Sequence, residues 1–100
     1  MNKRELIDNV AERTGSTKTI AEAAVNAVFD TIGNTVARGE KVALTGFGSF
    51  ERADRPARDA RNPATGAAIR VPAKFVPTFK AGADFKHRVA AEGARARATN

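Results

Sequence analysis

The chain of 100 residues has no cysteine, no tryptophan, no tyrosine and a single histidine. Without cysteine it has neither a disulfide framework nor a thiolate metal site, which is typical of a protein of the reducing cytoplasm. No segment reaches the roughly 18 apolar residues that a membrane span requires. The N-terminal segment has scattered charges instead of the apolar stretch of a signal peptide. We therefore expect a cytoplasmic protein without a membrane partner.

Side chains suited to catalysis are equally scarce. His87 stands between Lys86 and Arg88 on a predicted helix, where an exposed position is a simpler interpretation than a catalytic one. A general base needs a partner and a metal site needs several ligands at workable spacing, and the sequence offers neither. The Gly-x-Gly at residues 46–48 is too short for a nucleotide-binding fingerprint. We expect no enzyme activity, no cofactor and no metal.

Positive charge is concentrated in the second half of the chain. The formal net charge is +6; residues 1–51 hold 6 Lys/Arg against 7 Asp/Glu, and residues 52–100 hold 11 against 4. This asymmetry favours a polyanionic partner, with nucleic acid ahead of an anionic membrane. A merely solvated charged surface is the alternative that charge alone leaves open.

The first 39 residues predict a helical hairpin. Asn2 caps a first helix that Gly15 ends, Ser16 or Thr17 starts a second, and Gly39 ends it. The second helix has a broad apolar stripe, and no third long helix is available to cover it. A second copy of the chain is therefore expected to do so. The stripe consists of Ile20, Ala24, Val25, Val28, Phe29, Ile32 and Val36.

After Lys41 the apolar period changes to that of strands, with turns at Gly46–Gly48 and Asn62–Gly66. The polar segment between these turns predicts two strands that project beyond the core as an arm with Pro63 at its tip. An isolated two-stranded ribbon is marginally stable in water, so we expect the arm to be mobile without its ligand. One small α+β domain over 1–91 is predicted. Its parts are the helical hairpin 1–39, a three-stranded antiparallel sheet within 40–80 with an arm over 52–75, a short helix 83–91, and then a basic flexible tail 92–100.

The arm contains an arginine at every third position, namely Arg52, Arg55, Arg58 and Arg61. A strand repeats every second residue, so on a flat strand these side chains would alternate faces. On a twisted ribbon they can reach phosphates on both sides of a groove. Arginine suits this role because its planar fork binds phosphate bidentately and can enter a narrow minor groove. The alternative is an exposed edge ribbon kept soluble by charge.

Pro63 admits two interpretations. A rigid apolar residue at the tip can slip between base pairs and unstack them, at a cost of a few kcal/mol that new phosphate contacts offset. Equally, Pro63 can simply shape the turn.

The segment GFGSFERADRPARDARNPATG (Gly46–Gly66) resembles the HU/IHF family of bacterial nucleoid proteins. The shared pattern is Gly-Phe-Gly-x-Phe, then spaced arginines, then Arg-Asn-Pro-x-Thr-Gly. The similarity extends through MNKRELID at the start and VPTFKAGADFK near the end, about residues 1–90 in all. Within the family the chain looks closer to HU, and its Ala/Arg-rich end is similar to actinobacterial members. Ala83 departs from the pattern, because many relatives carry a phosphate-contacting Lys there.

The resemblance implies an intertwined homodimer or heterodimer whose two arms wrap the minor groove, a binding mode described for this family itself. The implied function is sequence-tolerant binding, bending and compaction of double-stranded DNA in the bacterial nucleoid. A site-preferring, IHF-like bender is the alternative, and RNA is a secondary partner, since every Phe is expected in the core. The expected DNA-binding residues are Lys3, Gly46, Gly48, Arg52, Arg55, Arg58, Arg61, Asn62, Pro63, Arg70, Lys74, Lys80 and Lys86. The expected dimer core is Val28, Phe29, Ile32, Val36, Leu44, Phe47, Phe50 and Phe79.

Overall fold

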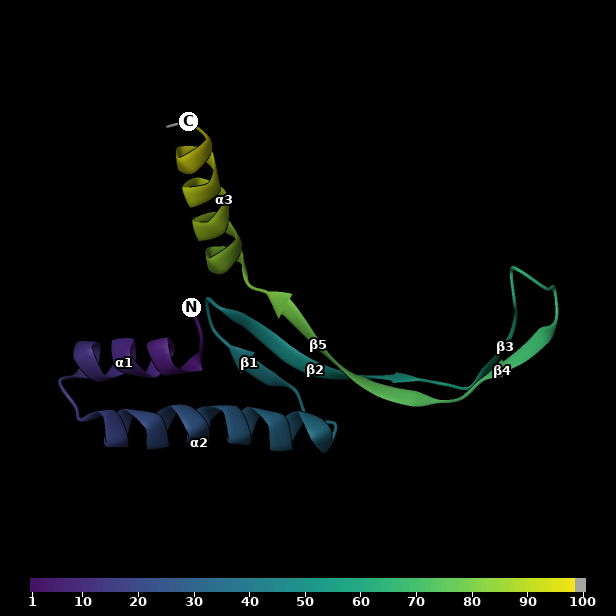
Figure 1. The fold of residues 1–100 in the computed structure, drawn as a ribbon, viewed down its shortest axis with the longest axis horizontal. Coiled ribbons are helices and arrows are strands. Elements are labelled where there is room, and N and C mark those ends of the chain that lie inside the picture. The colour runs from purple at the N-terminus through teal and green to yellow at the C-terminus, as the bar shows by residue number, and fades with distance from the viewer. Residues whose placement is uncertain (99–100) are drawn as a thin grey trace. The chain divides into compact units, whose positions relative to one another are not determined.

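A computed structural model describes residues 1–98 of the chain (Figure 1). Two helices, a run of antiparallel strands and a final helix follow one another as separate segments, as in an α+β protein, which confirms the predicted fold class. The elements in chain order are α1 (Lys3–Thr14), α2 (Lys18–Ala37), β1 (Val42–Leu44), β2 (Gly48–Arg55), β3 (Arg58–Arg61), β4 (Ala68–Val71), β5 (Lys74–Ala81) and α3 (Ala83–Ala98).

The chain forms two compact units, Met1–Thr35 and a second that begins at Val36. One small domain over 1–91 stays a prediction. The core of a single copy is small: among the described residues, the buried apolar side chains are Ala11, Ala21, Val25 and Val36. None is larger than valine, so one chain alone removes little apolar surface from water.

The helical hairpin follows the predicted capping residues. The Asn2 side chain accepts a hydrogen bond from the Glu5 backbone N–H at 2.9 Å, and Gly15 ends α1 in the left-handed region at φ 68°. Thr17 caps α2, because its hydroxyl oxygen accepts the Ile20 N–H at 3.2 Å. Within the described residues no helix, α2 included, is both long and apolar enough to cross a membrane.

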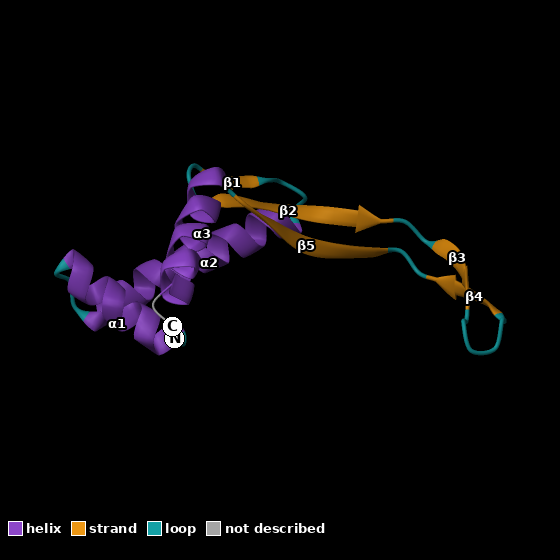
Figure 2. Ribbon diagram, turned by 90° about the horizontal axis from the view of Figure 1, so that it is seen from above, coloured by secondary structure: helices purple, strands orange, loops and turns teal. Residues whose placement is uncertain are grey.

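The three-stranded sheet has the order β1-β2-β5 with antiparallel neighbours. β2 and β5 pair along their whole length, from Gly48 opposite Ala81 to Arg55 opposite Lys74. A second ladder joins β3 to β4, from Arg58 opposite Val71 to Arg61 opposite Ala68. Figures 1 and 2 show this second ladder continuing the path of the β2–β5 ribbon, and loops separate the two.

The predicted arm over 52–75 is thus divided. Its first and last residues belong to the three-stranded sheet β1-β2-β5, here called the body sheet. The separate two-stranded arm comprises β3, β4 and the loop between them. The break on one side contains Pro56 and that on the other Pro72. Proline has no N–H to donate to a ladder, which explains why pairing stops at these points and resumes beyond them.

Four phenylalanines form the aromatic cluster of the second unit. Phe47 stacks on Phe85 with ring centroids 4.8 Å apart, and Phe79 lies 5.6 Å from Phe47 and 4.8 Å from Phe50. Gly48 borders the cluster: a Cβ there would lie 2.5 Å from the Phe79 ring. The cluster therefore needs glycine at this position.

The final helix is longer than predicted. α3 runs to Ala98, so the expected end near Ala91 and the flexible tail from Glu92 are wrong for residues 92–98; residues 99 and 100 lie outside the described part. Alanine and arginine are strong helix formers. Glu92 and Arg95 form an ion pair one turn apart, and basic residues in the last turn complement the helix dipole. Local propensity is therefore sufficient to continue the helix.

Candidate nucleic-acid interface

The ribbon of β2 and β5 has two chemically different faces. Successive side chains of a strand point to opposite faces, and residues directly opposite in an antiparallel pair share a face. The register therefore sorts the side chains into two sets. The aromatic face comprises Gly48, Phe50, Arg52 and Asp54 of β2 with Ala81, Phe79, Pro77 and Phe75 of β5. The cationic face comprises Ser49, Glu51, Ala53 and Arg55 of β2 with Lys80, Thr78, Val76 and Lys74 of β5.

The cationic face carries three of the predicted DNA-binding residues. Arg55, Lys74 and Lys80 are all exposed there. The acidic residue of this face, Glu51, forms an ion pair with Lys41 at 3.3 Å. The face consequently presents an excess of positive charge to solvent.

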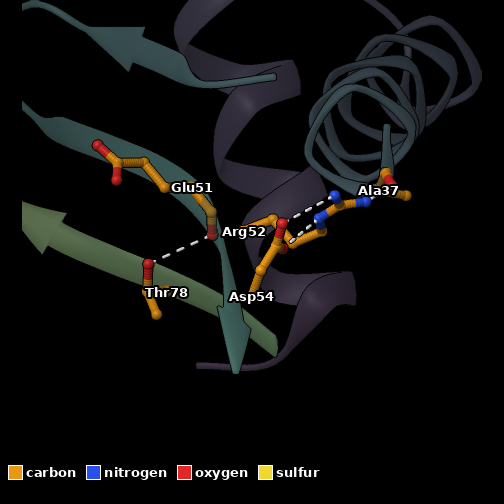
Figure 3. Close-up of polar contacts among 5 residues, drawn as sticks. All are labelled: Ala37, Glu51, Arg52, Asp54 and Thr78. Carbon is orange, nitrogen blue, oxygen red and sulfur yellow. Dashed lines mark hydrogen bonds and ion pairs between the residues drawn. The ribbon is translucent and has the colours of Figure 1, made fainter. Parts of the chain in front are cut away.

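Arg52 lies apart from these cations, because its side chain belongs to the aromatic face. Its Nε and Nη2 donate to the two carboxylate oxygens of Asp54 at 2.7 and 3.2 Å, and its Nη1 donates to the Ala37 carbonyl at 3.0 Å. Figure 3 shows Arg52 and Glu51 leaving opposite sides of β2. The expectation that Arg52 belongs to the arm is therefore wrong: it is a half-buried residue of the body sheet whose nitrogens already have partners.

In the arm, too, successive side chains alternate between two faces. Arg58 and Arg61 are exposed and, being three residues apart on β3, they face opposite sides of the arm. Arg70 on β4 is directly opposite Asp59, and the two form an ion pair at 3.0 Å. Arg70, like Arg52, is thus a predicted arm cation that is already paired with a carboxylate.

The tip is a hydrogen-bonded loop built around Asn62. Its side-chain oxygen accepts the Ala64 N–H at 2.8 Å, and its carbonyl accepts the Gly66 N–H at 2.7 Å. Arg61 donates to the Gly66 carbonyl at 3.0 Å. These bonds fix the turn and leave Pro63 exposed at its outer end.

Three other predicted contacts lie outside the ribbon and the arm. Gly46 has φ 84° in the turn before β2, and a Cβ there would lie 3.1 Å from the Asp84 carboxylate. Lys3 is exposed at the start of α1, and Lys86 is exposed on α3. Ala83, the departure from the family pattern, is the first residue of α3.

Most of the predicted dimer core is exposed in a single chain. Val28 is 54% exposed, Phe29 49% and Phe47 46%. Leu44 and Phe79 are also exposed, and Ile32 and Phe50 are half-buried. Val36 is the one member of the predicted set that is buried. Exposed apolar side chains of this size are typical of interaction surfaces.

The sequence does not predict the ion pair between Lys41 and Glu51, and the predicted place of one aromatic residue is wrong. Lys41 pairs with Glu51 on the adjacent strand, and their opposite charges are the only sequence signal for this contact. The expectation that Phe75 lies in the core is wrong: it is 66% exposed, with the Arg52 guanidinium 4.7 Å above its ring. Only the register of β5 against β2 reveals that these two residues share a face.

The fold and the charge distribution define a class of protein: a small α+β chain that presents a basic ribbon and arm and an uncovered apolar surface. The family described as Bacterial DNA-binding protein matches residues 1–90. The DNA-binding protein HU of Staphylococcus aureus (strain COL) is 54% identical over 89 residues, which are 89% of this chain and 99% of that protein. The same-named protein of Clostridium pasteurianum is 48% identical over 89 residues, 89% of this chain and 98% of that protein.

Solved structures agree with the sequence relatives. An Anabaena HU–DNA cocrystal structure is similar with a TM-score of 0.78 and 49% identity, over 90% of this chain and 98% of that one. HU from Thermotoga maritima is similar with a TM-score of 0.63 and 34% identity, over 89% and 98%. The chain belongs to the bacterial DNA-binding protein family, which confirms the resemblance found in its sequence. The family is one of DNA-binding proteins, and the chain is accordingly not an enzyme.

Proposed function

We propose that this chain is an architectural protein of the bacterial nucleoid that binds, bends and compacts double-stranded DNA as a dimer, with little dependence on sequence. The observation that carries the proposal is the pattern of charge along residues 48–81, which hold seven Lys/Arg and three Asp/Glu. Each of the three acids is already paired with a Lys or Arg. Five cations remain without an acidic partner among the described residues: Arg55, Arg58, Arg61, Lys74 and Lys80.

These five cations suit a phosphate backbone. Phosphate contacts fix a protein on the duplex without reading its sequence, and they supply most of the affinity in non-specific binding. The opposite orientations of Arg58 and Arg61 suit an arm that lies within a groove, with phosphates on both of its sides. The minor groove is the favoured groove, since arginine enters it readily where it is narrow.

The tip completes the proposed mechanism. Pro63 is exposed on a loop that Asn62 and Arg61 hold in shape. A rigid apolar ring in that position is suited to enter a base step and kink the duplex. We infer that Pro63 acts as this wedge, and that the arginines behind it stabilise the bent DNA.

Dimerisation supplies the second arm. The exposed Val28, Phe29 and Phe47 support a second copy of the chain as the covering molecule, because closed two-fold dimers are the commonest assembly of soluble proteins. A homodimer needs no other chain, and a heterodimer would need a relative with the same surface. The relatives named HU, one of them in a cocrystal with DNA, extend the DNA-binding interpretation to this chain through its family.

Two other partners have less support. The relatives described above are named HU, which does not favour an IHF-like preference for one site. RNA recognition usually stacks bases on exposed aromatic rings. The exposed aromatic residue at the root of the arm, Phe75, lies on the face opposite Arg55 and already carries the Arg52 guanidinium. RNA therefore remains a secondary partner, held by charge.

A salt titration tests the proposal. The affinity of the chain is measured for a random duplex and for a duplex selected for tight binding, at several salt concentrations. We expect log affinity to fall linearly with log salt, with a slope of about −0.9 for each phosphate neutralised, and nearly equal affinities for the two duplexes. An affinity that does not respond to salt would overturn the proposal, and a strong preference for the selected duplex would favour the IHF-like alternative.

A further inference from the structure

Arg52 differs from the other basic residues of the ribbon in that each of its three guanidinium nitrogens donates a hydrogen bond within the chain. The Asp54 carboxylate takes two of its nitrogens, and the carbonyl of Ala37, the last residue of α2, takes the third (Figure 3). Its side chain is 28% exposed, against 60% or more for residues such as Arg38 and Arg70. A phosphate could bind the Nε–Nη2 edge of Arg52 in a planar two-point contact only by displacing the Asp54 carboxylate.

The flat side of the guanidinium is occupied as well. Its Cζ lies 4.7 Å from the centre of the Phe75 ring, a cation–π arrangement that arginine makes more often than lysine. Phe75 is directly opposite Asp54 in the ladder. The Arg52 guanidinium therefore contacts both members of this cross-strand pair, Asp54 on β2 and Phe75 on β5.

Gly39 leaves the space that this arrangement needs. A Cβ at Gly39 would lie 3.1 Å from Nη2 and 3.3 Å from Cζ of Arg52, and its φ of 89° favours glycine independently. The last carbonyls of a helix lack partners within the helix, and an arginine side chain can satisfy one. The end of α2 therefore meets the ribbon through Arg52, three residues before β2 ends at Arg55.

We propose that Arg52, Asp54, Phe75 and the Ala37–Gly39 backbone form a bracket that fixes the β2–β5 ribbon to this backbone segment and so sets the direction in which the ribbon leads to the arm. Arg52 is then a positioning residue for DNA bending and not a phosphate contact. This inference rests on the proposed function, because the direction of the ribbon matters only if the arm grips DNA. The bracket lies at the end of the ribbon from which the arm continues, next to the breaks that contain Pro56 and Pro72.

The test compares Arg52 with Arg55, its neighbour on the cationic face. Full-length wild-type protein and the variants Arg52→Ala, Arg52→Lys, Arg55→Ala and Arg55→Lys are bound to an end-labelled duplex, below the unfolding temperature of each. Two quantities are measured: the salt slope of binding and the distribution of single-molecule energy transfer between the DNA ends. A role in stability alone would lower the unfolding temperature but leave that distribution unchanged.

The bracket predicts a specific pattern. Arg52→Ala keeps the wild-type salt slope but broadens the energy-transfer distribution toward less bent DNA, and Arg52→Lys does not restore it, since an ammonium group can neither bind a carboxylate as a planar fork nor stack. Arg55→Ala flattens the slope by about 0.9 for each phosphate that is no longer neutralised, and Arg55→Lys restores it. Asp54→Asn should broaden the distribution as Arg52→Lys does, although it removes no positive charge.

Two results would overturn the inference. A flatter slope for Arg52→Ala, restored by lysine, would make Arg52 a direct phosphate contact. A wild-type distribution for Arg52→Lys and Asp54→Asn would show that the bracket does not position the arm. A flat salt slope for the wild-type protein would instead refute the proposed function itself, so the two failures are distinguishable.

Discussion

The two faces of the β2–β5 ribbon come from the same two strands but differ in how their cations are exposed and paired. On the cationic face Arg55, Lys74 and Lys80 are exposed to solvent. On the aromatic face Arg52 lies among Asp54, Phe75 and the end of α2, with its charge compensated. Arg52 and Arg55 thus lie in different surroundings, because the face of the strand decides what each side chain can reach. The number of cations in a segment therefore overstates the number that are exposed and without a carboxylate partner.

The largest expected effect comes from removing the exposed arginines together. Changing Arg55, Arg58 and Arg61 to Ala should lower affinity for duplex DNA near 0.1 M salt on the order of a hundredfold and flatten the salt slope by about 0.9 for each phosphate left without its cation. Fluorescence anisotropy titrations with a labelled duplex measure both. The matched control changes Arg88, Arg95 and Arg97 on α3 to Ala, which removes the same charge elsewhere. Equal reductions in affinity in both triple variants would mean that net charge, and not its position, determines binding.

Phe47 tests the aromatic side of the comparison. It stacks on Phe85 and is 46% exposed in one chain. If a second copy covers it, Phe47→Ala should lower the free energy of unfolding by about 3 kcal/mol and weaken dimerisation. Urea unfolding at several protein concentrations measures both effects. Phe75→Ala is the control: this ring is 66% exposed, so the substitution should lower the free energy of unfolding by less than half as much as Phe47→Ala does. Equal destabilisation would contradict a buried role for Phe47.

Gly48 offers a finer test of the same face. A Cβ at this position would lie 2.5 Å from both the Phe79 ring and the Lys80 carbonyl oxygen. Gly48→Ala should therefore destabilise the fold by about 1–3 kcal/mol through overpacking. Gly93→Ala on α3 is the control: a Cβ there would meet no described atom within 4 Å beyond its chain neighbours and the helix's own backbone, and alanine should stabilise the helix by about 0.5–1 kcal/mol. Thermal unfolding separates the two, and an unchanged Gly48→Ala midpoint would contradict the close packing.

The smallest expected change in affinity belongs to the tip. Pro63→Ala removes the wedge but none of the five unpaired cations, so the salt slope should remain and the bend angle should decrease. Energy transfer between labelled DNA ends reports the bend. Ala64→Ser, a change beside Pro63 in the same exposed loop, serves as the control. A bend unaffected by Pro63→Ala would leave Pro63 with only the turn-shaping role.

Local patterns in the sequence are sufficient to predict much of the fold. Asn2, Gly15 and Gly39 mark the helix ends correctly, because caps and left-handed stops depend on neighbouring residues alone. The predicted α3 is too short, since Glu92–Ala98 has no apolar stripe and its helix depends on propensity and one ion pair. Apolar periodicity cannot detect such a helix.

The functional assignment of individual arginines requires the structure. The period of three indicates alternating faces, but which face holds the aromatic cluster follows only from pairing Arg52 with Pro77 and Asp54 with Phe75. Those partners are more than 20 residues apart in the sequence. Long-range register is what separates Arg52 from Arg55, and no local pattern contains it.

The most direct test of the central claim is the bend itself. A duplex with a donor dye at one end and an acceptor at the other is titrated with the full chain at low salt, while anisotropy confirms binding. Energy transfer should rise as the complex forms, because two arms bring the DNA ends closer together. Saturated binding with transfer equal to that of the free duplex would contradict the claim that this protein bends DNA.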